Sequence, residues 1–290
     1  MKIGTRGSAL ALVQAGAVAD ALGPGNELVH ITTTGDRQRG ALDKERWVRE
    51  LDEALLQGDV DLAVHSAKDV PAHLPDGLVI AAIPLRAPAV DALCGAPSLS
   101  ALAPGARVGT ASVRRAAQLR ALRDDLDITD LRGNVDTRLA RLHAGDYDAI
   151  VLALAGLERL SRAEEATGTL PELIPCAGQG ALLLTARAGD EPALAAAAAI
   201  DDAATHACVR AERELVRALD ADCHTPMGAH ATLAGGGAMT LTAFVGRPDG
   251  GAWLRDTLTV TGDAHTGPEA LGAQMGERLV SAGAREVLGR

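Results

Sequence analysis

The stretch Asp61-Leu62-Ala63-Val64-His65-Ser66-Ala67-Lys68-Asp69-Val70-Pro71 joins an apolar run to a charged pair and a proline. The apolar part predicts a buried strand that delivers Lys68 and Asp69 to its carboxyl end. In open α/β sheets ligands bind at that end, because connecting loops and helix N-termini meet there. The same spacing also fits a surface turn with a solvated ion pair. The rest of the chain has to decide between these two interpretations.

The composition bounds the class of protein. The chain has 290 residues, 47% of them hydrophobic, which suffices for two or three cores. The net charge is −10 and only four residues are aromatic, which argues against nucleic acid as a partner. The amino terminus lacks an apolar segment of signal-peptide length, and the alanine-rich run from Ala193 to Ile200 is too short to span a bilayer. We expect a cytoplasmic protein with no membrane partner.

The four cysteines show no C-x-x-C pairing, so neither a metal site nor a disulfide framework is predicted. Cys94, Cys176 and Cys208 are expected to be buried as small apolar residues. Cys223 differs because it lies in a predicted loop, where a thiol can become a covalent attachment point. As a lone residue it also fits an inert thiol.

A helix is expected to begin just after Arg6 and Ser8. Ser8 precedes an apolar run that continues to Leu22, where Gly23-Pro24 ends it. The free N–H groups of a helix N-terminus favour an anionic ligand, and an arginine adds a bidentate clamp. Simple capping with an incidental surface arginine explains the same residues.

Three successive strand-to-helix turns carry arginine. Strands are predicted at 107–109, 128–131 and 147–154, each followed by a helix. The carboxyl ends of parallel strands in one sheet lie along one edge, and arginines gathered there would repel one another without an anion. We infer a ligand with several carboxylates or phosphates, and no nucleotide-binding glycine motif is present. The arginines are Arg114, Arg115, Arg132, Arg138 and Arg159.

The order of these elements predicts three domains. Residues 1–95, with a returning strand and its surroundings at about 180–200, form a first α/β domain, and residues 99–176 form a second. The return makes a hinge between the two. Residues 203–290 form a smaller α+β domain with an antiparallel sheet. Residues of about 36–46, including Lys44, are expected to form a mobile loop.

At this point a family resemblance emerges, carried by short motifs that occur in family order and cover nearly the whole chain. They resemble those of the porphobilinogen deaminase (hydroxymethylbilane synthase) family. The motifs are H-S-A-K-D-V-P at 65–71, G-T-A-S-V-R-R at 109–115, L-R-G-N-V-D-T-R at 131–138, A-G-L-E-R-L at 155–160, G-Q-G-A at 178–181, and A-E-R-E-L with D-C-H-T-P-M-G within 211–228.

The resemblance implies a transferase of tetrapyrrole, and hence porphyrin and heme, biosynthesis. Such an enzyme condenses four porphobilinogen molecules head to tail with loss of ammonia and finally hydrolyses off linear hydroxymethylbilane. The growing polypyrrole chain starts from a dipyrromethane cofactor, thioether-linked to the cysteine that corresponds to Cys223. Asp69 matches the catalytic aspartate, whose carboxylate hydrogen-bonds pyrrole N–H groups and stabilises the cation formed as the amine leaves.

By the same resemblance, the other site residues bind the acetate and propionate groups of the pyrroles. Those expected to hold the cofactor, besides Asp69 and Cys223, are Lys68, Ser112, Arg114, Arg115 and Arg132. Those expected to hold substrate are Arg6, Ser8, Arg138, Arg159 and Lys44. The implied fold has two hinged, doubly wound α/β domains resembling periplasmic binding proteins, plus the smaller α+β domain, and we expect a monomer.

The chain departs from the usual family pattern at three places. Ala221-Asp222 stand where two glycines usually precede the cofactor cysteine, Glu45-Arg46-Trp47 follow Lys44 in place of Gly-Leu-Phe, and Asp136 replaces a common glycine. The alternative function is a non-catalytic carboxylate-binding protein of the same hinged fold. The missing signal peptide and the extra domain with Cys223 count against that alternative.

Overall fold

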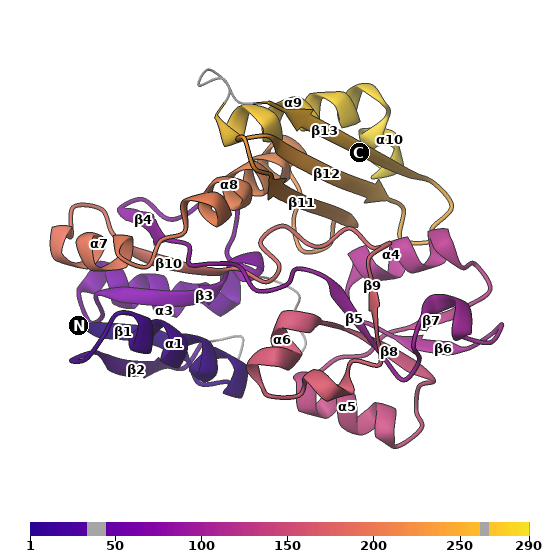
Figure 1. The fold of residues 1–290 in the computed structure, drawn as a ribbon, viewed down its shortest axis with the longest axis horizontal. Coiled ribbons are helices and arrows are strands. Elements are labelled where there is room, and N and C mark those ends of the chain that lie inside the picture. The colour runs from indigo at the N-terminus through magenta and orange to yellow at the C-terminus, as the bar shows by residue number, and fades with distance from the viewer. Residues whose placement is uncertain (34–44, 262–266, 290) are drawn as a thin grey trace. The chain divides into compact units, whose positions relative to one another are not determined.

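A computed structural model describes residues 1–33, 45–261 and 267–289 (Figure 1). The chain groups into two compact units, Met1–Ala87 with Gly178–Ala207 and Pro88–Ala177 with Cys208–Arg290. Within the described residues, the first unit contains one five-stranded sheet, and the second contains a five-stranded and a three-stranded sheet. The predicted division into three domains, and the hinge, stay predictions.

The sheet of the first unit is mixed. It contains β1 (Lys2–Arg6), β2 (Glu27–Ile31), β3 (Leu62–Ser66), β4 (Leu78–Ala82) and β10 (Leu182–Arg187), in the order β2-β1-β3-β10-β4. Strand β1 runs parallel to both β2 and β3, whereas β10 lies antiparallel between β3 and β4. The returning strand predicted within about 180–200 is β10, and it does join the first sheet, as expected.

Helices cover both faces of this sheet. Leu62 and Val64 pack on one face with α1 (Ala9–Ala21) and α7 (Glu191–Ala198), while Ala63 packs on the other with α3 (Glu45–Gln57). This split follows from β3 itself, because successive side chains of a strand point to opposite faces. Both faces of the central strand are therefore buried, which explains its continuous apolar sequence.

The five-stranded sheet of the second unit has the order β7-β6-β8-β5-β9. Strand β6 is parallel to β7 and β8, whereas β5 is antiparallel to β8 and β9. Two core clusters, on alternate residues of β5 and β8, bury the two faces of the sheet. The strands are β5 (Asp91–Cys94), β6 (Arg107–Gly109), β7 (Asp127–Thr129), β8 (Ala149–Ala153) and β9 (Gly168–Leu170), and the helices are α4 (Val113–Leu122), α5 (Val135–His143) and α6 (Leu154–Arg159).

The second unit also holds an antiparallel sheet, β11 (Met227–Leu233), β12 (Met239–Gly246) and β13 (Trp253–Val260), seen side by side in Figure 1. Helix α9 (Pro268–Ser281) packs on β12 and β13, and α10 (Ala284–Val287) follows it. The second unit's part of α8 (Ala203–Ala218) approaches α9 so closely that a Cβ at Gly272 would lie 2.4 Å from the Ala211 carbonyl oxygen.

The predicted fold class, two α/β sheets with a smaller α+β part, is confirmed. No helix in the described part of the chain is long and apolar enough to cross a membrane.

Candidate active site

Lys68 and Asp69 lie where the sequence predicts, directly after β3. They belong to a single 3₁₀ turn, Ala67–Asp69, which is closed by the Val70 N–H donating to the Ala67 carbonyl at 3.3 Å. Both side chains are half-buried. The strand therefore delivers this pair to its carboxyl end.

The G-Q-G turn supports this pair from the same unit. Gly178 has φ +72°, and a Cβ there would lie 2.8 Å from the Ala67 Cβ and 2.9 Å from the Lys68 nitrogen. The Ala67 N–H donates to the Ala181 carbonyl at 3.0 Å, which ties the turn to the 3₁₀ segment. Only glycine fits both the backbone angle and the close approach. The G-Q-G turn thus packs against the backbone of the 3₁₀ segment that carries Lys68 and Asp69. We call this contact of Gly178 with Ala67 and Lys68 the Gly178 brace.

Arg6 and Ser8 follow the neighbouring strand β1. Because β1 and β3 are parallel and paired, Arg6 ends its strand at the same sheet edge as Lys68 and Asp69. Ser8 is the N-cap of α1, and its hydroxyl accepts the Ala11 N–H at 3.3 Å. The predicted N-cap is confirmed, while a ligand-binding role for Arg6 and Ser8 stays a prediction.

The three arginine-bearing turns of the second unit follow β6, β7 and β8. These strands are neighbours and all parallel, so the predicted common edge is present even though the sheet as a whole is mixed. Ser112 caps α4 by accepting the Arg115 N–H, and Asn134 caps α5 by accepting the Thr137 N–H at 2.8 Å. The helices that carry the arginines therefore begin at one sheet edge.

Arg114 and Arg115 are buried against a residue that the sequence analysis missed, Asp91. The Asp91 side chain is fully buried at the start of β5, with its Oδ2 2.8 Å from Arg114 Nη2 and its Oδ1 2.7 Å from Arg115 Nη2. Backbone carbonyls complete the arrangement, since Arg114 donates to Ile174 O at 2.7 Å and Arg115 to Val151 O at 3.0 Å. One carboxylate and two guanidinium groups leave this cluster with a net positive charge.

Arg138 lies in the first turns of α5 and is half-buried. Burial, together with the positive charge of Arg115, lowers the pKa of Arg138 to about 10. Its Nε donates to the Gly133 carbonyl at 2.8 Å, and among the described residues no carboxylate forms an ion pair with it. A guanidinium held in such surroundings is an electrostatically favourable place for an anionic ligand.

The two remaining arginines of this edge differ in exposure. Arg159 ends α6 and is half-buried; burial lowers its pKa, and the charge of Glu158 partly offsets this. Arg132 is exposed, and its Nε lies 2.7 Å from Asp130 Oδ2. The guanidinium groups at this sheet edge therefore differ in solvent exposure, from exposed to buried.

Cys223 is half-buried in a turn between α8 and β11. Asp222 shapes this turn, because its Oδ1 accepts the His224 N–H at 2.9 Å and the Thr225 hydroxyl at 2.8 Å.

Of the other cysteines, Cys94 and Cys208 are buried as expected. Cys176 is only half-buried, so the prediction that it is buried is wrong. Cys176 lies in the irregular segment before the G-Q-G turn rather than inside a helix or strand. Lys44 lies outside the described residues.

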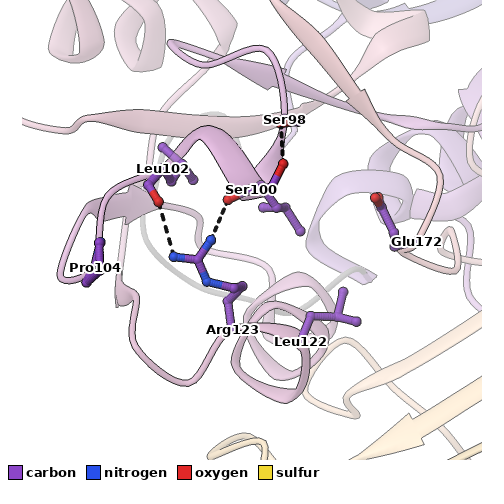
Figure 2. A pocket seen from close by; sticks show the side chains of 8 residues that line it. Ser98, Ser100, Leu102, Pro104, Leu122, Arg123 and Glu172 are labelled. Atoms are coloured by element: carbon purple, nitrogen blue, oxygen red, sulfur yellow. Dashed lines mark hydrogen bonds between the residues drawn. The ribbon is translucent and has the colours of Figure 1, made fainter.

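A pocket of about 540 Å³ on the second unit contains none of the predicted site residues (Figure 2). Ser98, Ser100 and Glu172 line it together with Arg123. The Arg123 guanidinium is held by the Leu99 and Leu102 carbonyls and by Asp125. Its donors therefore serve the local fold, and the pocket is not part of the candidate site.

Taken together, the fold and these residues define an α/β protein in which Asp69 lies at the sheet edge of one unit and a group of arginines lies at the sheet edge of the other. Residues 1–195 match the family model described as "Porphobilinogen deaminase, dipyromethane cofactor binding domain", and residues 206–281 match "Porphobilinogen deaminase, C-terminal domain". The chain belongs to the porphobilinogen deaminase family.

Curated relatives agree over almost the full length. The porphobilinogen deaminase of Brevibacillus brevis is 44% identical, with 99% of this chain and 96% of the relative covered. That of Roseiflexus castenholzii is 46% identical, with 99% and 98% covered. The predicted family is thereby confirmed, as are the enzyme class, a transferase of tetrapyrrole synthesis, and the dipyrromethane cofactor.

Solved structures of lower similarity were also found. The methionine-binding protein MetQ matches with a TM-score of 0.44 at 15% identity, over 71% of this chain and 91% of that one. A VFT2 domain of Bordetella pertussis BvgS matches with a TM-score of 0.42 at 14% identity, over 69% and 86%.

Proposed function

We propose that this enzyme is a hydroxymethylbilane synthase. It joins four porphobilinogen molecules head to tail, releases one ammonia at each condensation, and hydrolytically releases linear hydroxymethylbilane. The chain grows on a dipyrromethane primer that is thioether-linked to Cys223. The observation that carries the proposal is the row of arginines after β6, β7 and β8, in which burial and Arg115 lower the pKa of Arg138.

The residues present fit the dipyrromethane group. Each pyrrole carries an acetate and a propionate, and guanidinium groups bind carboxylates with paired N–H donors. The buried cluster of Asp91, Arg114 and Arg115 keeps a net positive charge, which a ligand carboxylate would balance. When bound, the group supplies the pyrrole carbon to which the first substrate is joined. In this proposal it is held by Lys68, Asp69, Ser112, Arg114, Arg115 and Arg132.

Asp69 is the proposed catalytic residue. Loss of ammonia from the aminomethyl group of porphobilinogen leaves a positive charge on the substrate, and a carboxylate held in place beforehand stabilises that charge. The 3₁₀ turn and the Gly178 brace hold the Asp69 backbone, so little reorganisation is needed during reaction. The proposed substrate ligands are Arg6, Ser8, Arg138, Arg159 and Lys44.

Intact-protein mass tests the primer and its attachment residue. The intact masses of the purified wild-type enzyme and of the Cys223→Ser variant are measured by mass spectrometry. Both proteins are also treated with an acidic colour reagent for pyrroles. We expect an adduct of two pyrrole units that is absent from the variant. A wild-type protein that remains unmodified after incubation with porphobilinogen or hydroxymethylbilane would refute the proposal.

Ammonia release tests the role of Asp69. Asp69→Ala is expected to abolish release from porphobilinogen while leaving the unfolding transition unchanged, because the side chain is half-buried. The exposed Asp76 of the same unit provides a matched control, since Asp76→Ala should leave turnover unchanged. Normal turnover in Asp69→Ala would exclude the assigned role.

The non-catalytic alternative would bind porphobilinogen and release no ammonia, so the same assay separates it from the enzyme. Membership of a transferase family favours the enzyme. A monomeric state, a cytoplasmic location and a hinge between the α/β domains complete the proposal. Size-exclusion chromatography with light scattering tests the first of these.

A further inference from the structure

We propose that Asp222 is a positioning residue for the Cys223 thiol, a role that rests on the proposed function. The Asp222 side chain closes the turn that carries Cys223 and thereby fixes how the thiol meets the incoming pyrrole. Cofactor loading forms a bond between sulfur and the pyrrole methylene carbon and breaks the aminomethyl C–N bond. The thiol proton leaves with the nitrogen as ammonia.

The turn is closed by reciprocal hydrogen bonds. The Asp222 N–H donates to the Thr225 Oγ1 at 3.0 Å, and that hydroxyl donates back to the Asp222 Oδ1 at 2.8 Å. The same Oδ1 accepts the His224 N–H at 2.9 Å, and the Thr225 N–H donates to the Asp222 carbonyl at 3.3 Å. Cys223 is thus enclosed between two residues that bond to each other through backbone and side chain.

The partner of Asp222 is itself fixed. Thr225 is buried, and its carbonyl accepts the Met227 N–H at 2.8 Å where β11 begins. The turn is consequently anchored to the antiparallel sheet rather than to a mobile terminus. Asp222 is exposed, so its side chain adopts this position because of the hydrogen bonds and not because of packing.

The backbone here needs no glycine. Among the described residues, the non-glycine positions with positive φ are Ser161 and Asp220, so Ala221, Asp222 and Cys223 all have ordinary negative φ. The left-handed residue that ends α8 is Asp220, with φ 47°. Ala221-Asp222 therefore introduce no backbone strain, and Asp222 adds side-chain bonds that a glycine could not make.

The Asp222 carboxylate is engaged by hydrogen-bond donors of the turn itself. Asp222, His224 and Thr225 line a small pocket of about 160 Å³ together with Gly246 and Pro248, and Cys223 does not line it. The negative charge is directed at two hydrogen-bond donors of the turn. A held thiol loses less freedom on reaching the reactive geometry, which speeds bond formation.

The rate of cofactor loading tests this role directly. The protein is produced in a host that makes no porphobilinogen, then mixed with porphobilinogen, and the mass increase is followed with time. We expect Asp222→Ala to slow loading about tenfold, in line with the sensitivity of reactions to small misplacements. Asp222→Asn retains the Oδ1 acceptor and should load within about twofold of wild type. Thr225→Val removes the partner hydroxyl and should behave like Asp222→Ala.

A matched control uses Asp249, an exposed residue of the same unit whose Oδ1 accepts the Gly251 N–H at 3.0 Å in a similar turn. Asp249→Ala should load at the wild-type rate. Near-normal loading in Asp222→Asn, in contrast to Asp222→Ala, separates a positioning role from a general loss of stability. If Asp222→Ala does not fold, the comparison of Thr225→Val with wild type takes its place.

Three distinguishable outcomes would overturn either the positioning role of Asp222 or the proposed function. Wild-type loading in Asp222→Ala or in Thr225→Val would refute the positioning role and leave the proposed function intact. Faster loading in both Asp222→Ala and Asp222→Asn would show that the charge hinders attachment, which also refutes it. Failure of the wild-type protein to load at all would overturn the proposed function, and the inference with it.

Discussion

Asp91 and Arg115 form a two-pronged ion pair inside the second unit, in which the Asp91 Oδ1 accepts hydrogen bonds from Arg115 Nε at 3.0 Å and Nη2 at 2.7 Å. Asp91 is fully buried and Arg115 is 6% exposed. The pair joins the first residue of β5 to the first turn of α4. Desolvating such charges is costly, so the complete set of partners, including Arg114, determines whether the pair stabilises the fold.

Removing the Asp91 carboxylate should therefore be severe. Asp91→Ala leaves two buried guanidinium groups without their shared counter-charge, and we expect the free energy of unfolding to fall by about 3–5 kcal/mol. Equilibrium unfolding in urea, with the slope checked for constancy, measures this loss. Asp127→Ala is the matched control, because its pair with Arg107 in the same sheet is exposed and should be worth at most about 1 kcal/mol. Similar losses in the two variants would contradict the special role of Asp91.

Gly178 should tolerate no side chain. Gly178→Ala adds a Cβ 2.8 Å from Ala67 at a φ of +72°, so we expect a loss of about 2–4 kcal/mol in stability. The same substitution displaces the turn that carries Asp69, and ammonia release from porphobilinogen should fall sharply. Gly189→Ala separates the two causes, because Gly189 has φ +85° but nothing within 4 Å of the added carbon. It should lose only about 1 kcal/mol and keep its turnover. Equal effects would show that the contact with Ala67 is unimportant.

Local sequence patterns were sufficient for the elements that frame the site. Strand β6 has the predicted bounds, because glycine and polar residues mark its ends. The return of β10 to the first sheet and the common edge of β6, β7 and β8 were also predicted correctly. Arginines placed directly after strands are a strong signal, since parallel strands bring such turns together whatever the rest of the sheet does.

Strand β5 could not be predicted in the same way. Its sequence Asp91-Ala92-Leu93-Cys94 begins with a carboxylate, and an isolated Asp normally indicates an exposed residue. The burial of Asp91 depends on Arg114 and Arg115, which follow later in the chain, so no local pattern reveals it. Two adjacent arginines at the start of a helix are the available signal, because such a pair needs a counter-charge nearby.

The support for the predicted site residues likewise depends on non-local contacts. The sequence places Lys68 and Asp69 after a strand, but the brace from Gly178 comes from a distant segment. The alanine-rich helix α7 and the three-residue strand β9 were not predicted either. Alanine gives little contrast between faces, and three residues are too few to show alternation.

Asp52 should make stability depend on pH. Burial, together with the charge of Glu53, raises the pKa of Asp52 from 3.8 to about 6. The folded state therefore holds this proton more tightly than the unfolded state, and the contribution to stability is lost as pH rises from about 4 to about 6. Asp52→Asn removes the cost of ionising a buried carboxyl group. Because one unit of pKa shift corresponds to about 1.4 kcal/mol, the free energy of unfolding of Asp52→Asn at pH 7 should exceed that of wild type by about 2–3 kcal/mol.

The comparison of Asp52→Asn with wild type is made by urea unfolding at several pH values. The gain should disappear below about pH 4, where Asp52 is protonated in both states. Asp59→Asn, at an exposed position just beyond the same helix, should show no such pH-dependent gain. A gain that persists unchanged in acid would mean that the substitution acts through packing or helix propensity rather than through the buried charge.

Arg138 should show opposite effects on stability and activity. Its guanidinium is partly desolvated beside Arg115, so Arg138→Met removes an unfavourable charge at the cost of the hydrogen bond to Gly133. We expect the cofactor-free protein to gain about 1–2 kcal/mol in stability, while turnover of porphobilinogen falls and its KM rises.

Arg141, one turn further along α5, is the control for Arg138. The hydrogen bond that Arg141 Nε donates to Asp146 raises the pKa of Arg141, and Arg141 also lies over the Tyr147 ring, 5.1 Å from its centroid. Arg141→Met should therefore give no gain in stability and no change in KM. If Arg138→Met destabilised the protein as well, the charge of Arg138 would be a structural one, and the arginine edge would lose its strongest indication of a carboxylate ligand.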